Sequence, residues 1–481
     1  MSLLSCPPDI LFRLFTHLDG YSLMRCREIC RRFNELISED VYSQYSLALY
    51  RSCMVDDLDT HPTLDISDRL NHLQSFLSRR SSWHTTGPDL TIPLPASSST
   101  RPLDWEYSSG LLVSLPTMRS VRSIDVMAST PGAIREMEVE SGEIDERSDY
   151  TEHVVDHSQD LLVVAAFKSL SPTHQESGFY VLSLSSGGPH PEAARSYTRL
   201  PYEVGTFLCL HVDVYEDFVL VCDSIDRSWW GGDIYVYNWK TGETTAHIRD
   251  IPDIGFIFLD RDHLIGCSMN HTESSVQLRV VSLKTSRCVL ILPFPELKHH
   301  NPLNFGIKSF SGTSRVPLHP NRRNPFHSSP DDTIISLQVQ EPNKWCFLCV
   351  FPKSSILELL TTMEELLPRA PRIIEWGTWP QSTFELPSPS PTRSHGSRLV
   401  IVLPNFNQIG IFDYPPRWFM REMKAVENGG VFAQPIMTIP PSQPSQEIHL
   451  EMNGGDWNLY FEEDLFVVGS FREGNHYVFK A

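Results

Sequence analysis

Apolar residues near the N-terminus follow a helical period, whereas those of the remaining chain form short runs typical of strands. The first apolar group recurs at spacings of one and three residues, which places its side chains on one face of a helix. Its members are Ile10, Leu11, Leu14, Phe15 and Leu18. Pro8 and Asp9 fit a helix start, since proline in the first turn loses no needed hydrogen bond and a carboxylate favours the positive end of the helix dipole.

Further helices follow the turn residues DGYS at 19–22, where Ser22 is a candidate cap for the next helix. Apolar residues from Leu23 to Ile37 continue at spacings of three and four. About 40 residues seldom bury enough surface to be stable alone, so the apolar faces need a partner. That partner is either the remainder of this chain or another protein.

A separate leucine-rich segment at 65–83 predicts a connecting helix, capped near Asp65 or Ser67.

From about residue 88 the pattern changes to a repeated unit. Each unit has a small or acidic residue, four or five apolar residues, a polar loop and an alternating second strand. The units start at Gly110, Asp160, Asp217, Asp262, Asp332, Ser397 and Asp464. The shortest interval matches a four-stranded propeller blade of about 40 to 50 residues, and the longer intervals imply insertions. No helical segments alternate with the strands, which favours a radial array of sheets over a βαβ fold.

Three segments of biased composition are expected outside the regular strands. The ranges 312–332 and 386–398 are rich in Pro, Ser and His and predict mobile loops. The acidic range 136–152 predicts another exposed segment.

Composition narrows the class of protein. The chain has 481 residues, of which 41% are hydrophobic and 21% charged, as expected for globular domains. Its formal charge of −19 argues against a nucleic-acid partner, because binding phosphates needs an excess of Lys and Arg. The ten cysteines are dispersed in apolar segments, which indicates reduced thiols in an intracellular protein. We expect no secretory signal and no contact with a membrane, since no run of about 18 apolar residues occurs.

The stretch PPDILFRLFTHLDGYSLMRCREICRRFNELI at 7–37 resembles the F-box, the module that binds the Skp-type adaptor of SCF ubiquitin ligases. The resemblance rests on a proline before an acidic residue, followed in order by paired apolar residues and a final Arg-Arg-Phe. It implies adaptor contacts by Pro7, Pro8, Ile10, Leu11, Leu14, Phe15, Leu18, Leu23, Ile29 and Cys30. Cys6 stands where the family usually has leucine, and Phe33 where many members have tryptophan, which puts the strength of adaptor binding in doubt. Related fungal F-box proteins also carry a leucine-rich helix that ends near a tryptophan, a place that Trp83 fits.

The arginines at 25, 27, 31 and 32 form a basic cluster beside this motif. They fit a solvated helix face, with nucleic-acid binding as the alternative, since the chain is acidic and no aromatic residues are interleaved.

The segment GGDIYVYNWKTGE at 231–243 resembles a WD-repeat strand and its turn, although the GH and WD dipeptides are missing from the expected places. The resemblance implies a divergent, WD-like propeller of six or seven blades, since the last strands can complete the first blade. A pair of β-sandwiches is the alternative.

In such a propeller the loops between the second and third strands of each blade share one face. Trp229 and Trp230 lie in one of these loops, and tryptophan often anchors interfaces; alternatively, both rings fold back onto their own blade. The candidate substrate-binding residues are Trp229, Trp230, His271, Phe406, Arg472 and His476.

Catalytic signatures are missing from the sequence. There is no phosphate loop, zinc-binding HExxH, nucleophile elbow or GxGxxG turn. Cys346 and Cys349 have CxxC spacing, but residues three apart in a strand point to opposite faces, and no further ligand completes a zinc set. We therefore predict no catalytic, cofactor or metal site.

Together these patterns predict an α+β multidomain chain, with a helical F-box module at 1–48, a helical linker at 49–87 and an all-β propeller-like domain at 88–481. The expected function is that of a substrate receptor, which binds a Skp-type adaptor, through it a cullin, and an unidentified protein substrate. The alternatives are a scaffold acting outside ubiquitin transfer and a hydrolytic propeller enzyme, for which perturbed carboxylates or histidines in the central channel would be the sign.

Overall fold

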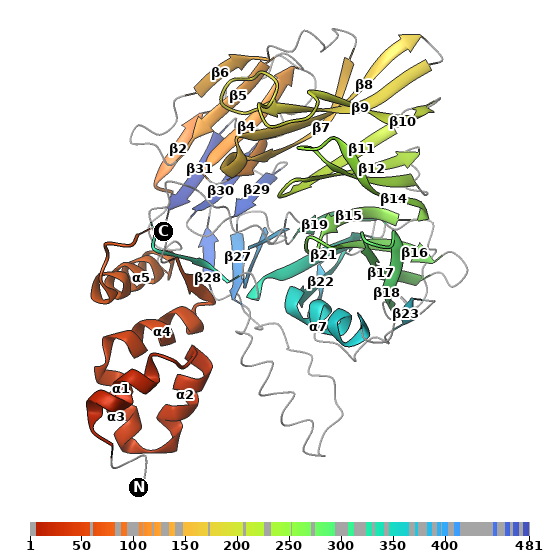
Figure 1. The fold of residues 1–481 in the computed structure, drawn as a ribbon. Coiled ribbons are helices and arrows are strands. Elements are labelled where there is room, and N and C mark those ends of the chain that lie inside the picture. Colours follow the sequence, from red (N-terminus) through yellow and green to blue (C-terminus); the bar gives the residue numbers. More distant parts are fainter. Residues whose placement is uncertain are drawn as a thin grey trace.

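The computed structural model describes a helical module followed by a β-rich region (Figure 1). No helix among the described residues is long and apolar enough to cross a membrane. The described residues are 6–57, 61–81, 88–93, 105–108, 110–117, 120–126, 134–139, 148–171, 174–204, 208–225, 232–251, 253–270, 275–293, 306–311, 324–329, 332–340, 346–364, 371–373, 382–386, 392–395, 397–402, 408–413, 446–449, 457–461, 465–470 and 475–480.

Aspartates precede three of the five helices of the N-terminal region and accept hydrogen bonds from their first turns. Asp19 Oδ1 accepts a hydrogen bond from Ser22 N at 2.8 Å, so Asp19 is the cap and the expectation for Ser22 is wrong. Asp65 Oδ1 accepts from the backbone N–H three residues on, which confirms a helix start at this position. The helices are α1 (Pro8–Phe15), α2 (Gly20–Ile29), α3 (Arg31–Glu39), α4 (Val41–Arg51) and α5 (Ile66–Ser81).

The β-rich region contains, within the described ranges, seven sheets of four or five strands. Sheet one contains β3 (Trp105–Ser108), β4 (Leu111–Thr117), β5 (Ser120–Asp125) and β6 (Ile134–Glu138). Sheet two contains β7 (Ser148–Asp156), β8 (Leu161–Ser171), β9 (His174–Ser183) and β10 (Tyr197–Val204). Sheet three contains β11 (Leu208–Tyr215), β12 (Phe218–Ile225), β13 (Gly232–Asn238) and β14 (Glu243–Ile251). Sheet four contains β15 (Asp253–Phe258), β16 (His263–Asn270), β17 (Ser275–Ser282), β18 (Arg287–Pro293) and the parallel edge strand β23 (Arg372–Ile373).

Sheets five and six carry the longer insertions, and sheet seven follows them in the chain. Sheet five contains β19 (Gly306–Ser311), β21 (Ile334–Gln340), β22 (Cys346–Pro352) and β24 (Ser382–Leu386). Sheet six contains β25 (Thr392–His395), β26 (Arg398–Val402), β27 (Gln408–Asp413) and β28 (Gln446–His449). Sheet seven contains β29 (Trp457–Phe461), β30 (Leu465–Ser470), β31 (Asn475–Lys480) and β2 (Leu90–Pro93).

The seven apolar runs of the sequence pattern form the second strand of every sheet. In the first two sheets the residue that begins the run belongs to the turn from the first strand. Gly110 and Asp160 lie there with φ of 86° and 54°, the left-handed region that a tight turn requires. The repeated unit of the sequence is therefore one sheet.

Neighbouring sheets pack face to face, because successive apolar side chains of a strand point to opposite faces. In β8, Val163 packs towards sheet three and Leu162 towards sheet one. The ring closes where Ile92 of β2 and Val467 of β30 pack with Trp105 of sheet one. The arrangement is propeller-like, with seven such sheets among the described residues, and the last three strands share a sheet with β2, the first strand of the propeller-like region.

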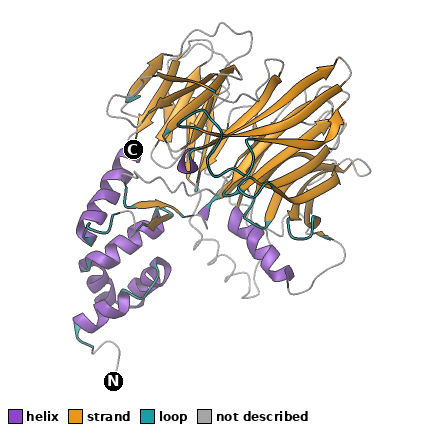
Figure 2. Cartoon of the chain, turned by 45° about the horizontal axis from the view of Figure 1, so that its top comes forward, coloured by secondary structure: helices purple, strands orange, loops and turns teal. Residues whose placement is uncertain are grey.

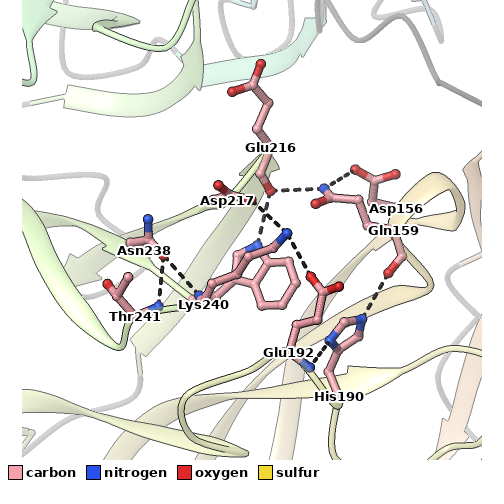
Figure 3. Close-up of polar contacts among 10 residues, drawn as sticks. Asp156, Gln159, His190, Glu192, Glu216, Asp217, Asn238, Lys240 and Thr241 are labelled. Atoms are coloured by element: carbon pink, nitrogen blue, oxygen red, sulfur yellow. Dashed lines mark hydrogen bonds and ion pairs between the residues drawn. The ribbon is translucent and has the colours of Figure 1, made fainter.

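Polar contacts between turns also join sheets two and three (Figure 3). The side chain of Gln159, in the single-turn 3₁₀ helix η2 (His157–Gln159), donates to Asp156 Oδ2 at 2.8 Å and to the carbonyl of Glu216 at 3.0 Å. The same carbonyl accepts a hydrogen bond from Trp239 Nε1 at 3.1 Å. Trp239 lies in the turn after β13, so one carbonyl connects three turns.

Helix α7 (Lys353–Glu364), between β22 and β24, was not predicted from the sequence. Its Ile356 and Leu360 pack with Ile335 and Phe351 of sheet five, so it belongs to the core between sheets four and five.

A two-stranded sheet connects the helical module to the propeller-like region. Strand β1 (Met54–Asp56) pairs antiparallel with β20 (Phe326–Ser328), which lies between β19 and β21 of sheet five. In Figure 2 these short strands lie between the helices and the larger sheets.

Two segments expected as mobile loops contain strands. In the range 312–332, β20 is paired and the Phe326 side chain is fully buried, although 312–323 lie outside the described residues. In the range 386–398, residues 392–395 form β25, the first strand of sheet six. Both expectations are wrong for these residues, because β20 pairs with the distant β1 and β25 pairs with the adjacent strand β26.

Candidate functional site

The helical module has its own apolar core. One cluster contains the buried side chains of Leu11, Phe15, Leu23, Phe33, Ile37 and Leu47, from helices α1 to α4. Only one edge of the apolar face of α1, with Leu11 and Phe15, packs in this core, and the other edge faces outward.

The outward edge of α1 carries apolar side chains that the described residues leave about half exposed. Ile10 is 49% exposed and Leu14 is 45% exposed, and Pro7 is also exposed. These three residues are three and four positions apart, so they form one stripe along the start of the helix. Ile29, at the end of α2, is the most exposed large apolar residue of the module, at 66%. We call Pro7, Ile10, Leu14 and Ile29 the apolar stripe.

The structure divides the residues predicted to contact an adaptor into two groups. Leu11, Phe15 and Leu23 are buried in the core, so their side chains do not face a partner. Leu18 and Cys30 are half-buried, and Cys30 Sγ accepts a hydrogen bond from Phe33 N at 3.5 Å at the start of α3. Outward-facing members are Pro7, Pro8, Ile10, Leu14 and Ile29.

The basic cluster near the apolar stripe is paired locally. Arg31 Nε contacts Glu35 Oε1 at 2.7 Å, and Arg25 contacts Glu28 at 3.1 Å. Such exposed pairs contribute about 0.2 to 1 kcal/mol, so they do little for stability. They favour the interpretation of a solvated helix face.

Residues 3–48 match the F-box-like family model. The match covers the helices that carry both the core and the apolar stripe, so an F-box-like domain opens this chain. No curated protein matches the chain.

Solved structures similar to about four fifths of the chain at low identity include the following two. Sqt1 of Saccharomyces cerevisiae is 12% identical, with a TM-score of 0.42 over 78% of this chain and 83% of Sqt1. Hydrazine synthase of Kuenenia stuttgartiensis is 9% identical, with a TM-score of 0.44 over 81% of this chain and 99% of that one. The arrangement of the sheets therefore rests on this chain's own strand pairing and packing.

Most of the candidate substrate-binding residues lie outside the described residues, so their assignment stays a prediction. This holds for Trp229, Trp230, His271, Phe406 and Arg472. His476 is the second residue of β31 and is 2% exposed, with its ring edge-on to Trp105 at a centroid distance of 5.5 Å. Burial lowers the pKa of His476 to about 4. This position, between sheets seven and one, argues against the predicted surface contact.

The first strands of sheets one to three bring together a group of titratable residues that sequence reasoning missed. His211 Nδ1 of β11 lies 3.0 Å from Glu152 Oε1 of β7, and Glu152 Oε2 also accepts from Val212 N at 3.2 Å. Burial alone would lower the pKa of His211, but the charge and hydrogen bond of Glu152, with Asp213 and Glu106, raise it to about 9. The signal available was a His and a Glu in the first strand of adjacent repeats.

This pair is poorly suited to hydrolysis. A general base needs a pKa near the working pH, whereas the His211 imidazole is protonated at neutral pH. Glu152 is occupied by two hydrogen bonds, one of them to the backbone edge of the next sheet. The pair is therefore better suited to stabilising the contact between sheets two and three than to acid–base catalysis.

Candidate metal ligands do not gather in the described part of the chain, where no three His, Cys, Asp or Glu side chains lie together as a metal site. Cys349 in β22 is a fully buried free thiol, and burial raises its pKa. The side chain of Cys346 lies outside the described set, so the prediction that this CxxC pair forms no metal site stays a prediction.

Proposed function

We propose that this chain is the substrate-receptor subunit of an SCF-type ubiquitin ligase. The F-box-like domain binds a Skp-type adaptor through the apolar stripe, the adaptor joins it to a cullin, and the propeller-like region binds a protein substrate. An intracellular location follows from this role. The contribution to catalysis is proximity, which raises the effective concentration of substrate lysines near the ubiquitin-loaded enzyme.

The observation that carries the proposal is the apolar stripe on a domain that matches the F-box-like model. Ile10, Leu14 and Ile29 are three of six exposed large apolar side chains among the described residues of the chain, and all three lie within a module of some 40 residues. Burying such side chains is favourable by roughly 25 cal/mol per Å² of apolar surface removed from water. A few apolar anchors can supply most of the binding free energy of an interface.

The proposal is tested by binding of the purified full chain to a recombinant Skp-type adaptor. We expect the double variant Leu14→Ser with Ile29→Ser to bind at least about tenfold more weakly, because each lost anchor costs 1 kcal/mol or more. The matched control is Ile134→Ser in β6, a residue of similar exposure at 41%, which should bind like wild type. No adaptor binding by wild type, or equal binding by the double variant, would overturn the proposal.

Binding to a cullin distinguishes the receptor role from that of a scaffold that acts outside ubiquitin transfer. The receptor role predicts that wild-type chain, adaptor and cullin elute as one complex, and that the Leu14 and Ile29 double variant is excluded from it. A complex with the adaptor that cannot accept cullin would instead favour the scaffold.

A further inference from the structure

We propose that the insertion of sheet five holds the F-box-like domain and the propeller-like region as one rigid body, with Phe326 and Arg69 as the positioning residues. The segment that does so, 324–329 with its strand β20, is here called the strut. The coupling stands independently of the proposed function, whereas its consequence for ubiquitin transfer rests on that function.

The strut is tied to the helical module along its length. All three residues of β20 pair with β1, and the pairing continues beyond both strands. Asp57 N donates to the carbonyl of Pro325 and Ser329 N to that of Cys53, each at 2.8 Å. The backbone that leaves α4 is thus held over five residues by a segment of the propeller-like region.

The strut is also tied to sheet five. Only four residues separate Ser328, the end of β20, from Thr333, which precedes β21. Thr333 Oγ1 donates to the carbonyl of Ser329 at 3.5 Å, and the carbonyl of Thr333 accepts from Lys353 N at 2.8 Å. Ser329, Thr333 and Lys353 are all buried, so the attachment is part of the packed interior.

Phe326 completes the apolar core of the linker helix. Its fully buried ring packs edge-on against Phe76 of α5 with ring centroids 5.3 Å apart, and the same cluster includes Tyr45 and Leu49 of α4 and Leu73 of α5. Helices α4 and α5 therefore share a core with a side chain from the strut. Loss of the ring would leave a cavity between the two helices and release the strut from both.

Arg69 makes the polar, geometry-dependent contacts between α5, β1 and the strut. Its side chain is 3% exposed, and Nη1 contacts Asp56 Oδ1 of β1 at 2.6 Å and the carbonyl of Pro325 in the strut at 3.4 Å. Tyr45 donates to the same Asp56 oxygen at 2.8 Å, and Nη2 of Arg69 donates to the carbonyl of His61. A buried guanidinium keeps its partners only in one geometry, so this network selects one orientation of α5 relative to the strut.

A rigid joint has a consequence for transfer of ubiquitin. If the segment between α4 and α5 were a free tether, the adaptor-binding stripe and the substrate face would sample many separations. The strut removes that freedom, so the distance from adaptor to substrate is set by the fold. Effective concentration is greatest when a fixed spacing matches the distance to be spanned.

The rigidity is measured by single-molecule energy transfer between dyes attached at the two chain termini of the full-length protein. We expect one narrow distribution for wild type and a width at least twofold greater for Phe326→Ala. The matched control is Phe351→Ala, which removes an equally buried ring from sheet five without touching the helical module. The control should stay narrow; an unchanged width for Phe326→Ala would overturn the proposal.

A disulfide staple keeps the test decisive should Phe326→Ala unfold the linker. Val55 lies opposite His327 across the β1–β20 pair, and facing residues of such pairs have Cα separations within disulfide range. Oxidised Val55→Cys with His327→Cys should leave the wild-type distribution unchanged and restore a narrow one in the Phe326→Ala background. A staple that shifts the wild-type distribution, or fails to form, would show that these strands are not paired.

Reconstitution with adaptor, cullin and the ubiquitin-loading enzyme tests the consequence. We expect the chain's own lysines to be modified at a small set of positions in wild type and at a broader set in Phe326→Ala, with the staple reversing the change. The same positions in all variants would overturn the link between rigidity and transfer. No modification in any variant would count against the proposed function, while the energy-transfer result would still decide the coupling.

Discussion

Phe15 packs edge-on against Phe33, with ring centroids 5.8 Å apart and ring planes at 84°. The preceding residue, Leu14, is 45% exposed and lies in the apolar stripe. Adjacent residues of α1 therefore have different roles: Phe15 holds the F-box-like domain together, and Leu14 is available to a partner. Both residues belong to the same apolar pattern in the sequence, but one faces the core of the domain and the other faces outward.

This division predicts opposite results for two neighbouring truncations. Phe15→Ala should destabilise the F-box-like domain by about 3 to 5 kcal/mol, because it leaves a cavity among α1, α2 and α3. Leu14→Ala should leave the midpoint of unfolding unchanged and weaken adaptor binding alone. Hydrogen exchange of α2 and α3 amides, read beside adaptor affinity, checks both. Equal protection in the two variants would contradict this assignment of roles.

The apolar pattern predicted α1 but not which of its edges is buried. Successive helical residues are 100° apart, so the five apolar positions from Ile10 to Leu18 cover an arc wider than one neighbouring helix can bury. Leu11 and Phe15 fall on the covered edge, and Ile10 and Leu14 on the open one. Only the positions of α2 to α4 decide between the edges, and these depend on tertiary packing.

The sheets were easier to predict than their insertions. The second strand of each sheet is buried on both faces, so it appears in the sequence as a continuous apolar run. Strand β20 has three residues and pairs with a segment some 270 residues away, so no local pattern marks it. Helix α7 did carry a signal, since Ile356 and Leu360 lie one helical turn apart, but the short strands around it masked the change of period.

The pair of His211 and Glu152 predicts a pH dependence of stability. Because the pKa of His211 is raised to about 9 in the folded chain, the contribution of the pair is complete below about pH 6.5, the ordinary value for histidine, and is lost as pH rises through 9. The pair is partly exposed, so it contributes no more than about 1 kcal/mol.

Thermal unfolding from pH 6 to pH 10 measures this effect. We expect the difference in midpoint between wild type and Glu152→Gln to be largest near pH 6 to 7 and to shrink towards pH 10. Subtracting the variant removes the titration of other groups from the comparison. A difference that grows with pH would contradict the assigned direction of the pKa.

In the turn after β13, we expect a buried aromatic ring to contribute more to the free energy of unfolding than two surface ion pairs do. Lys240 Nζ contacts Glu192 Oε2 at 2.8 Å and Asp217 Oδ1 at 3.1 Å, yet it lies at the surface, where such pairs contribute about 0.2 to 1 kcal/mol (Figure 3). Trp239 is 3% exposed and packs with the core between sheets two and three. Urea unfolding should show a loss of about 3 to 5 kcal/mol for Trp239→Ala and less than about 1 kcal/mol for Lys240→Ala. A larger loss for Lys240→Ala than for Trp239→Ala would overturn this ranking.

The close approach of α2 and α4 predicts an unusual response to a helix-favouring substitution. Alanine normally stabilises a helix relative to glycine by about 0.5 to 1 kcal/mol. At Gly20, however, an added Cβ would lie 2.2 Å from Cβ of Tyr50, so α2 and α4 would have to separate. Gly20→Ala should therefore destabilise the F-box-like domain, by about 1 to 3 kcal/mol, as overpacking of a core does.

Two further variants show whether that loss comes from the helix contact. Gly188→Ala meets only ordinary contact, with Ser186 Oγ at 3.5 Å, and should leave the unfolding midpoint unchanged. Tyr50→Gly removes both obstructing atoms, Cβ and Cγ of Tyr50, so Gly20→Ala should cost less in its presence than alone. If Gly20→Ala instead raised the unfolding midpoint of the wild-type chain, intrinsic helix propensity would dominate, and the two helices would have room for a side chain between them.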